Sequence, residues 1–268
     1  MREASTNDQF QLSGAWNFRD VGGARTTEGL EVRRGVLYRS SELTRLDARG
    51  HEELVRLGVK QVFDLRGETE IERSGTDRVP GSVRVHNVPY DNHRGEKAPH
   101  EARITASEDA QLDYMMRAYT SYASLEGARI AIRRVVTALG TGEGPVLVHC
   151  AAGKDRAGWT IATVLRAAGV DDAHIVADYL RSNAAVESLR AHVQASSAAD
   201  ENGAPIELSD ALLGVTERYY RHGLEAVEHV HGSFDGYLDA IGIDGDDLLR
   251  LRSTLLVGPG GAVSMTSN

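Results

Sequence analysis

The stretch at residues 146–158, which reads VLVHCAAGKDRAG, constrains the fold more than any other part of the chain. An apolar strand runs into Cys150, five residues follow before Arg156, and an apolar helical pattern begins at Trp159. The amino terminus of a helix offers unsatisfied N–H groups and the positive end of the helix dipole, and Gly153 lets the loop curl inward. The stretch therefore predicts an α/β fold with an anion site between a strand and a helix.

Cys150 and Arg156 suit nucleophilic attack on a phosphorus atom. A cysteine beside such a positive site is stabilised as its thiolate, which is the nucleophilic form. The planar guanidinium of Arg156 can hold two oxygens of a tetrahedral oxyanion, which a lysine cannot copy. Nucleophile, amide cradle and guanidinium together stabilise the charge that develops on the equatorial oxygens during such an attack.

The string HCAAGKDRAG resembles the loop signature of the cysteine-dependent protein tyrosine phosphatase superfamily. It is most similar to the bacterial tyrosine/dual-specificity and phosphoinositide phosphatases, whose loop carries Gly-Lys-Asp-Arg. Further strings resemble the same group in the family's order, over roughly residues 14 to 190: NFRDVGG at 17–23, LYRS at 37–40, DLR at 64–66 and DYLRSN at 178–183. The resemblance implies a phosphatase-like α/β fold, with a central mostly parallel sheet flanked by helices and an extra C-terminal helical part.

The resemblance also implies a two-step hydrolysis of a phosphomonoester. Cys150 attacks phosphorus to give a phosphocysteine, and His149 orders the loop by hydrogen bonding without acting as the base. Lys154 brings a second positive charge to the mouth of the site, where it binds a further phosphate or tunes the thiolate. The substrate-binding residues implied in this way are His149, Ala151, Ala152, Gly153, Lys154, Asp155 and Arg156.

Three aspartates are candidates for the general acid that protonates the leaving oxygen and then activates water. Asp91 follows a predicted strand and precedes the helices before the cysteine loop, in the order of the acid in related phosphatases. Asp155 lies inside the loop, and relatives with Gly-Lys-Asp-Arg are thought to use it. Asp64 ends another predicted strand. Each also has a structural interpretation: Asp91 as a turn residue beside a proline, and Asp155 as a residue that orients Arg156.

Two positions depart from the family pattern. The superfamily usually has Ser or Thr directly after the arginine, where a hydroxyl hydrogen-bonds the sulfur, and this chain has Ala157. The position after the cysteine is Ala151, where relatives often carry a bulkier residue. We therefore expect a weaker hold on the thiolate and a wider mouth.

Composition excludes several other classes. The formal charge of −9 argues against a nucleic-acid partner, and the single cysteine excludes an intramolecular disulfide. No cofactor or metal is expected, and the oligomeric state stays open. Residues 1–12 are polar and lack the apolar segment of a signal peptide, which favours a cytoplasmic protein without stable membrane insertion. Relatives can be exported without a classical signal, so secretion by such a route is an alternative.

Apolar spacing and turn residues predict a single phosphatase domain over 11–257, between flexible termini at 1–10 and 258–268. The helical part at about 184–231 is either a lid over the site or a rigid extension, joined through a small polar linker at 196–205. We expect the charged run at 68–73 to be solvated, and Arg39 to be either solvated or in an ion pair near the site. Helices are predicted at 47–57, 108–122, 125–139, 159–168, 172–180, 208–214, 216–231, 234–241 and 246–256, and strands near 16–21, 32–38, 59–65, 83–90 and 146–148.

The predicted substrate is a phosphorylated protein or a phosphoinositide, with dual specificity preferred because Lys154 and a wide mouth admit more than phosphotyrosine. Three alternatives remain: an inositol phosphate phosphatase, a phospho-binding protein that has lost turnover through Ala157, and a sulfurtransferase of the rhodanese type. Rhodanese loops usually lack this histidine and the Gly-Lys-Asp-Arg string.

Overall fold

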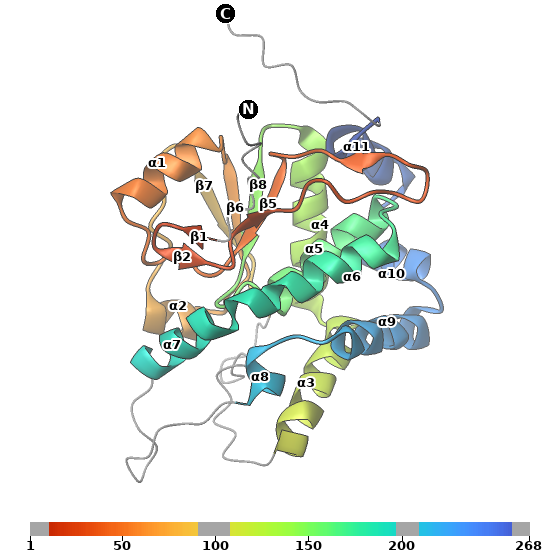
Figure 1. The fold of residues 1–268 in the computed structure, drawn as a ribbon. Coiled ribbons are helices and arrows are strands. Elements are labelled where there is room, and N and C mark those ends of the chain that lie inside the picture. Colours follow the sequence, from red (N-terminus) through yellow and green to blue (C-terminus); the bar gives the residue numbers. More distant parts are fainter. Residues whose placement is uncertain (1–10, 91–107, 197–208, 259–268) are drawn as a thin grey trace, which may run out of the picture.

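The computed structural model describes residues 11–90, 108–196 and 209–258, and its centre is a five-stranded sheet in the order β3-β5-β8-β6-β7 (Figure 1). Strands β5, β8, β6 and β7 run parallel, and β3 is antiparallel at one edge. The predicted α/β class with a mostly parallel sheet is therefore confirmed. The strands are β3 Arg19–Asp20, β5 Leu37–Ser40, β8 Val146–His149, β6 Gln61–Asp64 and β7 Arg84–Asn87.

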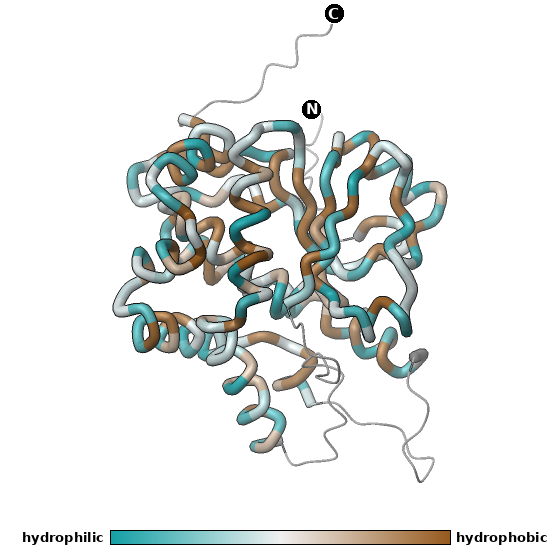
Figure 2. The backbone as a smooth tube through the Cα atoms, turned by 180° about the vertical axis from the view of Figure 1, so that it is seen from behind, coloured by the Kyte–Doolittle hydropathy of each residue, from teal (hydrophilic) through white to brown (hydrophobic). Residues whose placement is uncertain are grey.

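The central strands are hydrophobic on both faces because helices cover both sides of the sheet. Val146 and Val148 of β8 join one apolar core, whereas Leu147 between them points into a second core on the opposite face. The first core contains α4 (Glu126–Thr141) and α5 (Arg156–Ala167), and Leu54 of α1 (Ala48–Arg56) lies in the second. Figure 2 shows hydrophobic stretches along the central strands and alternating colours along the helices around them.

Most of the remaining helices follow the predicted boundaries closely, whereas α2, η2 and α7 lie where no helix bounds were predicted. Asp47 caps α1 by accepting from Gly50 N, as a side-chain oxygen at that position should. The other helices are α2 Glu68–Ser74, α3 Glu108–Tyr122, α6 Asp172–Leu180, η2 Arg181–Ala185, α7 Val186–Ser196, α8 Asp210–Leu213, α9 Glu217–His231, α10 Phe234–Ile241 and α11 Gly245–Leu255. Short strands complete the fold: β1 Gln11–Leu12, β2 Ala15–Trp16, β4 Glu31–Val32 and β9 Leu256–Val257.

The last described strand returns to the amino-terminal part of the chain, since β9 pairs antiparallel with β4. On the other side of the molecule, Leu189 of α7 and Leu213 of α8 form a small apolar cluster with Ala152 of the cysteine loop. The helical part is thus packed against the loop. The predicted linker at 196–205 lies almost wholly outside the described residues, as do the termini at 1–10 and 259–268. Among the described helices, none is long and apolar enough to cross a membrane.

Candidate active site

Strand β8 brings Cys150 to the centre of the carboxyl edge of the sheet. Ser40, His149 and Asp64 end β5, β8 and β6 at the same register, so the loop at 150–155 rises from the middle of this edge. Crevices at the carboxyl ends of parallel strands are where open α/β sheets bind ligands. The sulfur is nearly enclosed, because Cys150 is 2% exposed.

The carbonyl oxygens of the loop are turned outward and bound by the surrounding scaffold. Ala151 O accepts from Glu42 N at 3.0 Å, and Ala152 O accepts from the Asn17 side chain at 3.0 Å. Arg39 donates to Gly153 O at 2.7 Å and to Lys154 O at 3.3 Å. In a trans peptide the N–H points opposite to the C=O, so these bonds direct the loop amides inward. The loop thereby forms a concave cradle for an anion.

Gly153 is required at its position in this cradle. Its φ of +69° lies in the left-handed region, and a Cβ there would lie 2.2 Å from Ser40 O. A side chain would therefore push the loop off β5 as well as strain the backbone.

Arg39 belongs to a buried group that we call the Asp178 cluster, formed by Asp178, Arg19 and Arg39. Arg19 Nε and Arg39 Nη1 donate to separate oxygens of Asp178, at 2.8 and 2.7 Å. Burial raises the pKa of Asp178, but the two arginines outweigh it and hold that pKa far below its usual value. Burial and the neighbouring Arg39 lower the pKa of Arg19 to about 10. Of the two expectations for Arg39, the ion pair near the site is confirmed.

Arg156 begins α5 and is locked by a carboxylate that the sequence did not reveal. Its Nη1 and Nη2 donate to the two oxygens of Glu70 at 2.5 and 2.7 Å, while its buried Nε finds no partner in the described part of the chain. Glu70 lies in α2, so the prediction that 68–73 is a solvated run is wrong at this residue, which is 7% exposed. The paired carboxylate fixes the guanidinium and leaves Nε to bind an oxyanion.

His149 lies at the edge of a second buried group, the Arg66 cluster, made of Arg66, Asp64, Asp77, Glu42 and His149. His149 Nε2 is 2.7 Å from Asp77 Oδ2, and its Nδ1 is 3.2 Å from Cys150 O. Both partners are acceptors, so both ring nitrogens donate and the ring is a cation. Burial lowers the pKa of His149, but the charges of Asp77 and Asp64 outweigh it and raise that pKa above its usual value.

Asp64 does not fit the role of general acid. Its Oδ1 accepts from Arg66 Nε at 2.9 Å and its Oδ2 from Arg66 Nη2 at 2.8 Å, and the residue is 2% exposed. Asp64, Asp77 and His149 also place ligand atoms within 4.8 Å of one another. Arg66 already binds both of these carboxylates, so it supplies the positive charge that a metal ion would bring.

Lys154 lies elsewhere than expected. Its Nζ donates to the carbonyls of Leu212 and Gly214 at 2.7 and 3.0 Å, beside α8, and it is 2% exposed. The expectation of a cation projecting into a wide mouth is therefore wrong in this conformation, because α8 and the turn after it cover the side chain. The other contact of Lys154 is Asp155, whose Oδ2 lies 3.1 Å from Nζ.

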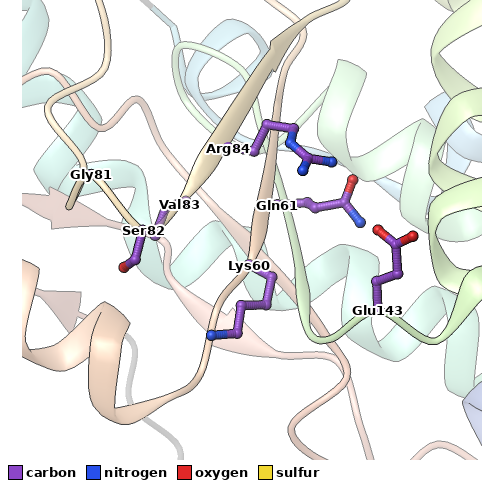
Figure 3. Close-up of a pocket in the computed structure, with 7 residues that line it drawn as sticks. All are labelled: Lys60, Gln61, Gly81, Ser82, Val83, Arg84 and Glu143. Carbon is purple, nitrogen blue, oxygen red and sulfur yellow. The ribbon is translucent and has the colours of Figure 1, made fainter.

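Asp155 is the general-acid candidate that the structure places in the loop itself, whereas Asp91 lies outside the described residues. A cavity of about 440 Å³ lies at the opposite, amino end of β6 and β7 (Figure 3). It is lined by Lys60, Gln61, Gly81, Ser82, Val83, Arg84 and Glu143. Since it lies at the other end of these strands from the cysteine loop, it is not part of this site.

A buried cysteine at the start of an amide-lined loop, followed by an arginine whose guanidinium is held by a carboxylate, is the arrangement of the cysteine-dependent phosphatases. Comparison with known proteins agrees: a family model described as "Tyrosine phosphatase family" matches residues 10–257. The chain belongs to the tyrosine phosphatase family.

Two curated relatives cover most of the chain. The triple specificity protein phosphatase PtpB of Mycobacterium tuberculosis is 40% identical, over 92% of this chain and 98% of that protein. A putative tyrosine-protein phosphatase of Cupriavidus necator is 32% identical, over 90% and 86%. A solved structure, TpbA of P. aeruginosa, matches with 20% identity and a TM-score of 0.32, covering 80% of this chain and 90% of that one.

Proposed function

We propose that this phosphatase works through a phosphocysteine on Cys150 and accepts phosphotyrosine, phosphoserine, phosphothreonine and phosphoinositides. The observation that carries the mechanism is the outward anchoring of four successive loop carbonyls, at residues 151–154, together with the unpartnered Arg156 Nε. Both features leave N–H donors available to an anion in the loop. The broad substrate range is supported by the 40% identical relative that is named a triple specificity phosphatase.

In this mechanism each loop residue has a part. Cys150 attacks phosphorus, and the leaving oxygen departs with the proton of Asp155. Water then attacks the phosphocysteine, and Asp155 takes a proton from it to regenerate the acid. The inward amides of the loop and Arg156 hold the equatorial oxygens in both steps. The imidazolium of His149 stabilises the thiolate through its position beside Cys150.

We also interpret residues 11–257 as one domain, in which α7 and α8 form a cover over the loop. The contacts of Leu189 and Leu213 with Ala152, and of Lys154 with the carbonyls after α8, support this interpretation. A cover over the mouth requires opening before a protein or lipid substrate enters. We place the protein in the cytoplasm.

Phosphate release from a substrate panel tests the proposal. Phosphotyrosine, phosphoserine and phosphothreonine peptides, phosphoinositides and inositol hexakisphosphate are each incubated with wild type and Cys150→Ser. Turnover of the peptides and phosphoinositides that disappears in Cys150→Ser is the expected result. Release from inositol hexakisphosphate alone would replace the proposed range by inositol phosphates. Tight vanadate binding without any turnover would indicate a phospho-binding protein.

A further inference from the structure

A line of buried hydroxyl groups runs into the cysteine loop and ends on Asp155. The hydroxyl of Tyr119, on α3, donates to Asp155 Oδ1 at 3.0 Å. The hydroxyl of Tyr179, on α6, donates in turn to the oxygen of Tyr119 at 2.5 Å. Tyr119 is 0% exposed and Tyr179 is 1% exposed, so both groups reach Asp155 from the protein interior.

Packing alone does not explain these two hydroxyls. The Tyr119 ring is fixed edge-on against Tyr179 and Trp159, with centroids 6.3 and 6.5 Å apart, and phenylalanine would make the same ring contacts. Burying a hydroxyl is costly unless it is hydrogen-bonded. The line satisfies Tyr119 on both sides and Asp155 on one, so the hydroxyls are tied to the carboxylate.

We propose that Tyr119, held by Tyr179, is a positioning residue that orients the Asp155 carboxyl for proton transfer to the leaving oxygen. This inference rests on the proposed function, in which Asp155 carries that proton. The line is not a path for protons to solvent, because Tyr179 at its inner end is itself buried.

Several other charged or titratable groups face Asp155 or the tyrosines around it. Lys154 Nζ is the cation in contact with it, at 3.1 Å, and Arg156 is the next residue in the chain. On α3, burial and the charges of Asp155 and Cys150 raise the pKa of Tyr122, while the charge of Arg156 lowers it. On β5, the charge of Arg39 acts against the rise in the pKa of Tyr179.

The two tyrosines themselves remain protonated donors throughout the working pH range. Burial, followed by the charge of Asp155, raises the pKa of both Tyr119 and Tyr179 well above the usual value. The hydroxyl of Tyr119 is therefore present as a donor to Asp155 at every pH of interest. Without that donor, the Asp155 carboxyl is free to turn away from the leaving group.

The test compares two substrates that differ in their need for an acid. The leaving group of phenyl phosphate is a basic phenolate that needs a proton. The leaving group of p-nitrophenyl phosphate is a stabilised anion that does not. Because kcat/KM reports the steps up to phosphocysteine formation, it isolates the step in which the two leaving groups differ. Tyr119→Phe should lose about 10-fold in kcat/KM on phenyl phosphate and less than ~3-fold on p-nitrophenyl phosphate, as partial loss of a general acid worth ~10²–10⁴ requires.

Tyr179→Phe keeps the bond between Tyr119 and Asp155, so it should give a smaller change in the same direction. Tyr237→Phe is the matched control, since it removes one buried hydroxyl from the same aromatic core, where it bonds to Tyr122 O and Trp159 Nε1. It should leave the ratio of the two kcat/KM values unchanged. Thermal unfolding of each variant verifies that the fold is intact.

Equal losses of kcat/KM on both substrates would overturn the inference and leave Tyr119 a purely structural role. Unchanged rates in both Tyr119→Phe and Tyr179→Phe would overturn it as well. Cys150→Ser run in parallel separates the two levels of the argument. If that variant keeps wild-type turnover, the proposed phosphocysteine mechanism fails, whatever the tyrosine variants do.

Discussion

The cysteine loop is held from two sides by buried charged groups whose balance is opposite. In the Asp178 cluster two arginines share one carboxylate, so positive charge is in excess. In the Arg66 cluster one arginine faces three carboxylates, so negative charge is in excess. The Asp178 cluster donates to peptide carbonyls of the loop through Arg39, and the Arg66 cluster binds the ring of His149 through Asp77.

The difference shows how each side stabilises its part of the site. In the Asp178 cluster, the N–H groups of Arg39 that Asp178 does not occupy donate to loop carbonyl oxygens, which turns the loop amides inward. In the Arg66 cluster, the three carboxylates outnumber the one arginine, and the protonated ring of His149 supplies a further positive charge. Asp77 and Asp64 thus keep the His149 ring charged beside Cys150. They lie at its Nε2, whereas its Nδ1 faces the carbonyl oxygen of Cys150.

Removing the charge of Asp178 should destabilise the Asp178 cluster more than any other change proposed here. Asp178→Asn leaves Arg19 and Arg39 buried beside each other without a carboxylate, and both are 0% exposed. Loss of one partner from a buried ion pair typically costs ~3–5 kcal/mol, so we expect a fall of that size in the free energy of unfolding. Urea titration at pH 7 measures it.

Asp172→Asn is the matched control for that change. Asp172 also pairs with two arginines, Arg166 and Arg221, but its side chain is 34% exposed. Surface pairs contribute ~0–1 kcal/mol, so the control should change stability little. A loss in Asp178→Asn no greater than in this control would contradict the view that the Asp178 cluster is needed for its charge.

The two sides differ also in how well the sequence predicted them. The Asp178 cluster comes from strings with a family pattern, and the resemblance indicated Arg39 as an ion-pair partner near the site. Glu70 and Asp77 lie in a charged stretch whose composition is that of a solvated surface. Glu70 has the local signal of a helix N3 acid, since it accepts from Gly67 N at 2.9 Å, and this explains its helix but not its partner.

Glu70→Gln tests whether the missed carboxylate positions Arg156. The guanidinium would lose a two-point charged partner, and a hydrogen bond to a charged group is worth ~1.5–3 kcal/mol. We expect kcat/KM to fall roughly 10–100-fold, with the loss mainly in kcat, because Arg156 holds the charge that grows in the transition state. Glu72→Gln, on the exposed face of the same helix, should retain wild-type kinetics. Similar rates in the two variants would remove Glu70 from the site.

Asp77→Asn should weaken the Arg66 cluster, and its effect on the free energy of unfolding should depend on pH. Because folding raises the pKa of His149, its pairing contributes full stability below ~6.5 and loses it as pH rises through the raised value. Asp77→Asn should therefore cost ~1–2 kcal/mol at pH 6, and this cost should shrink by pH 9. Unfolding titrations of both proteins at several pH values measure the difference. A cost that stays constant across this range would show that the charge of His149 contributes nothing.

Lys154 and the cover formed by α7 and α8 mark the limit of what the sequence could predict. A helix was predicted at 208–214, where α8 lies, but α7 was expected only as part of the helical segment at about 184–231. Their placement over the loop depends on contacts between residues about 60 positions apart, such as Lys154 with Leu212, which no local pattern encodes. The bond between Tyr119 and Asp155 could not be predicted either, because a tyrosine on the apolar face of a helix is expected to be a core residue.

Ala157, in the first turn of α5, offers the smallest test. It is 0% exposed and belongs to the same apolar core as Cys150, and it puts a methyl group where the family pattern has a hydroxyl. Ala157→Ser adds a donor that stabilises the departing thiolate as the phosphocysteine breaks down. A hydrogen bond worth ~0.5–1.5 kcal/mol predicts a gain in kcat of roughly 2–10-fold where that step limits turnover, with little change in kcat/KM. Rapid-quench measurement of the phosphoenzyme should show a lower steady-state level in the variant. A reduced kcat with an unchanged phosphoenzyme level would mean that the two clusters already hold the thiolate fully and that the added oxygen only crowds the core.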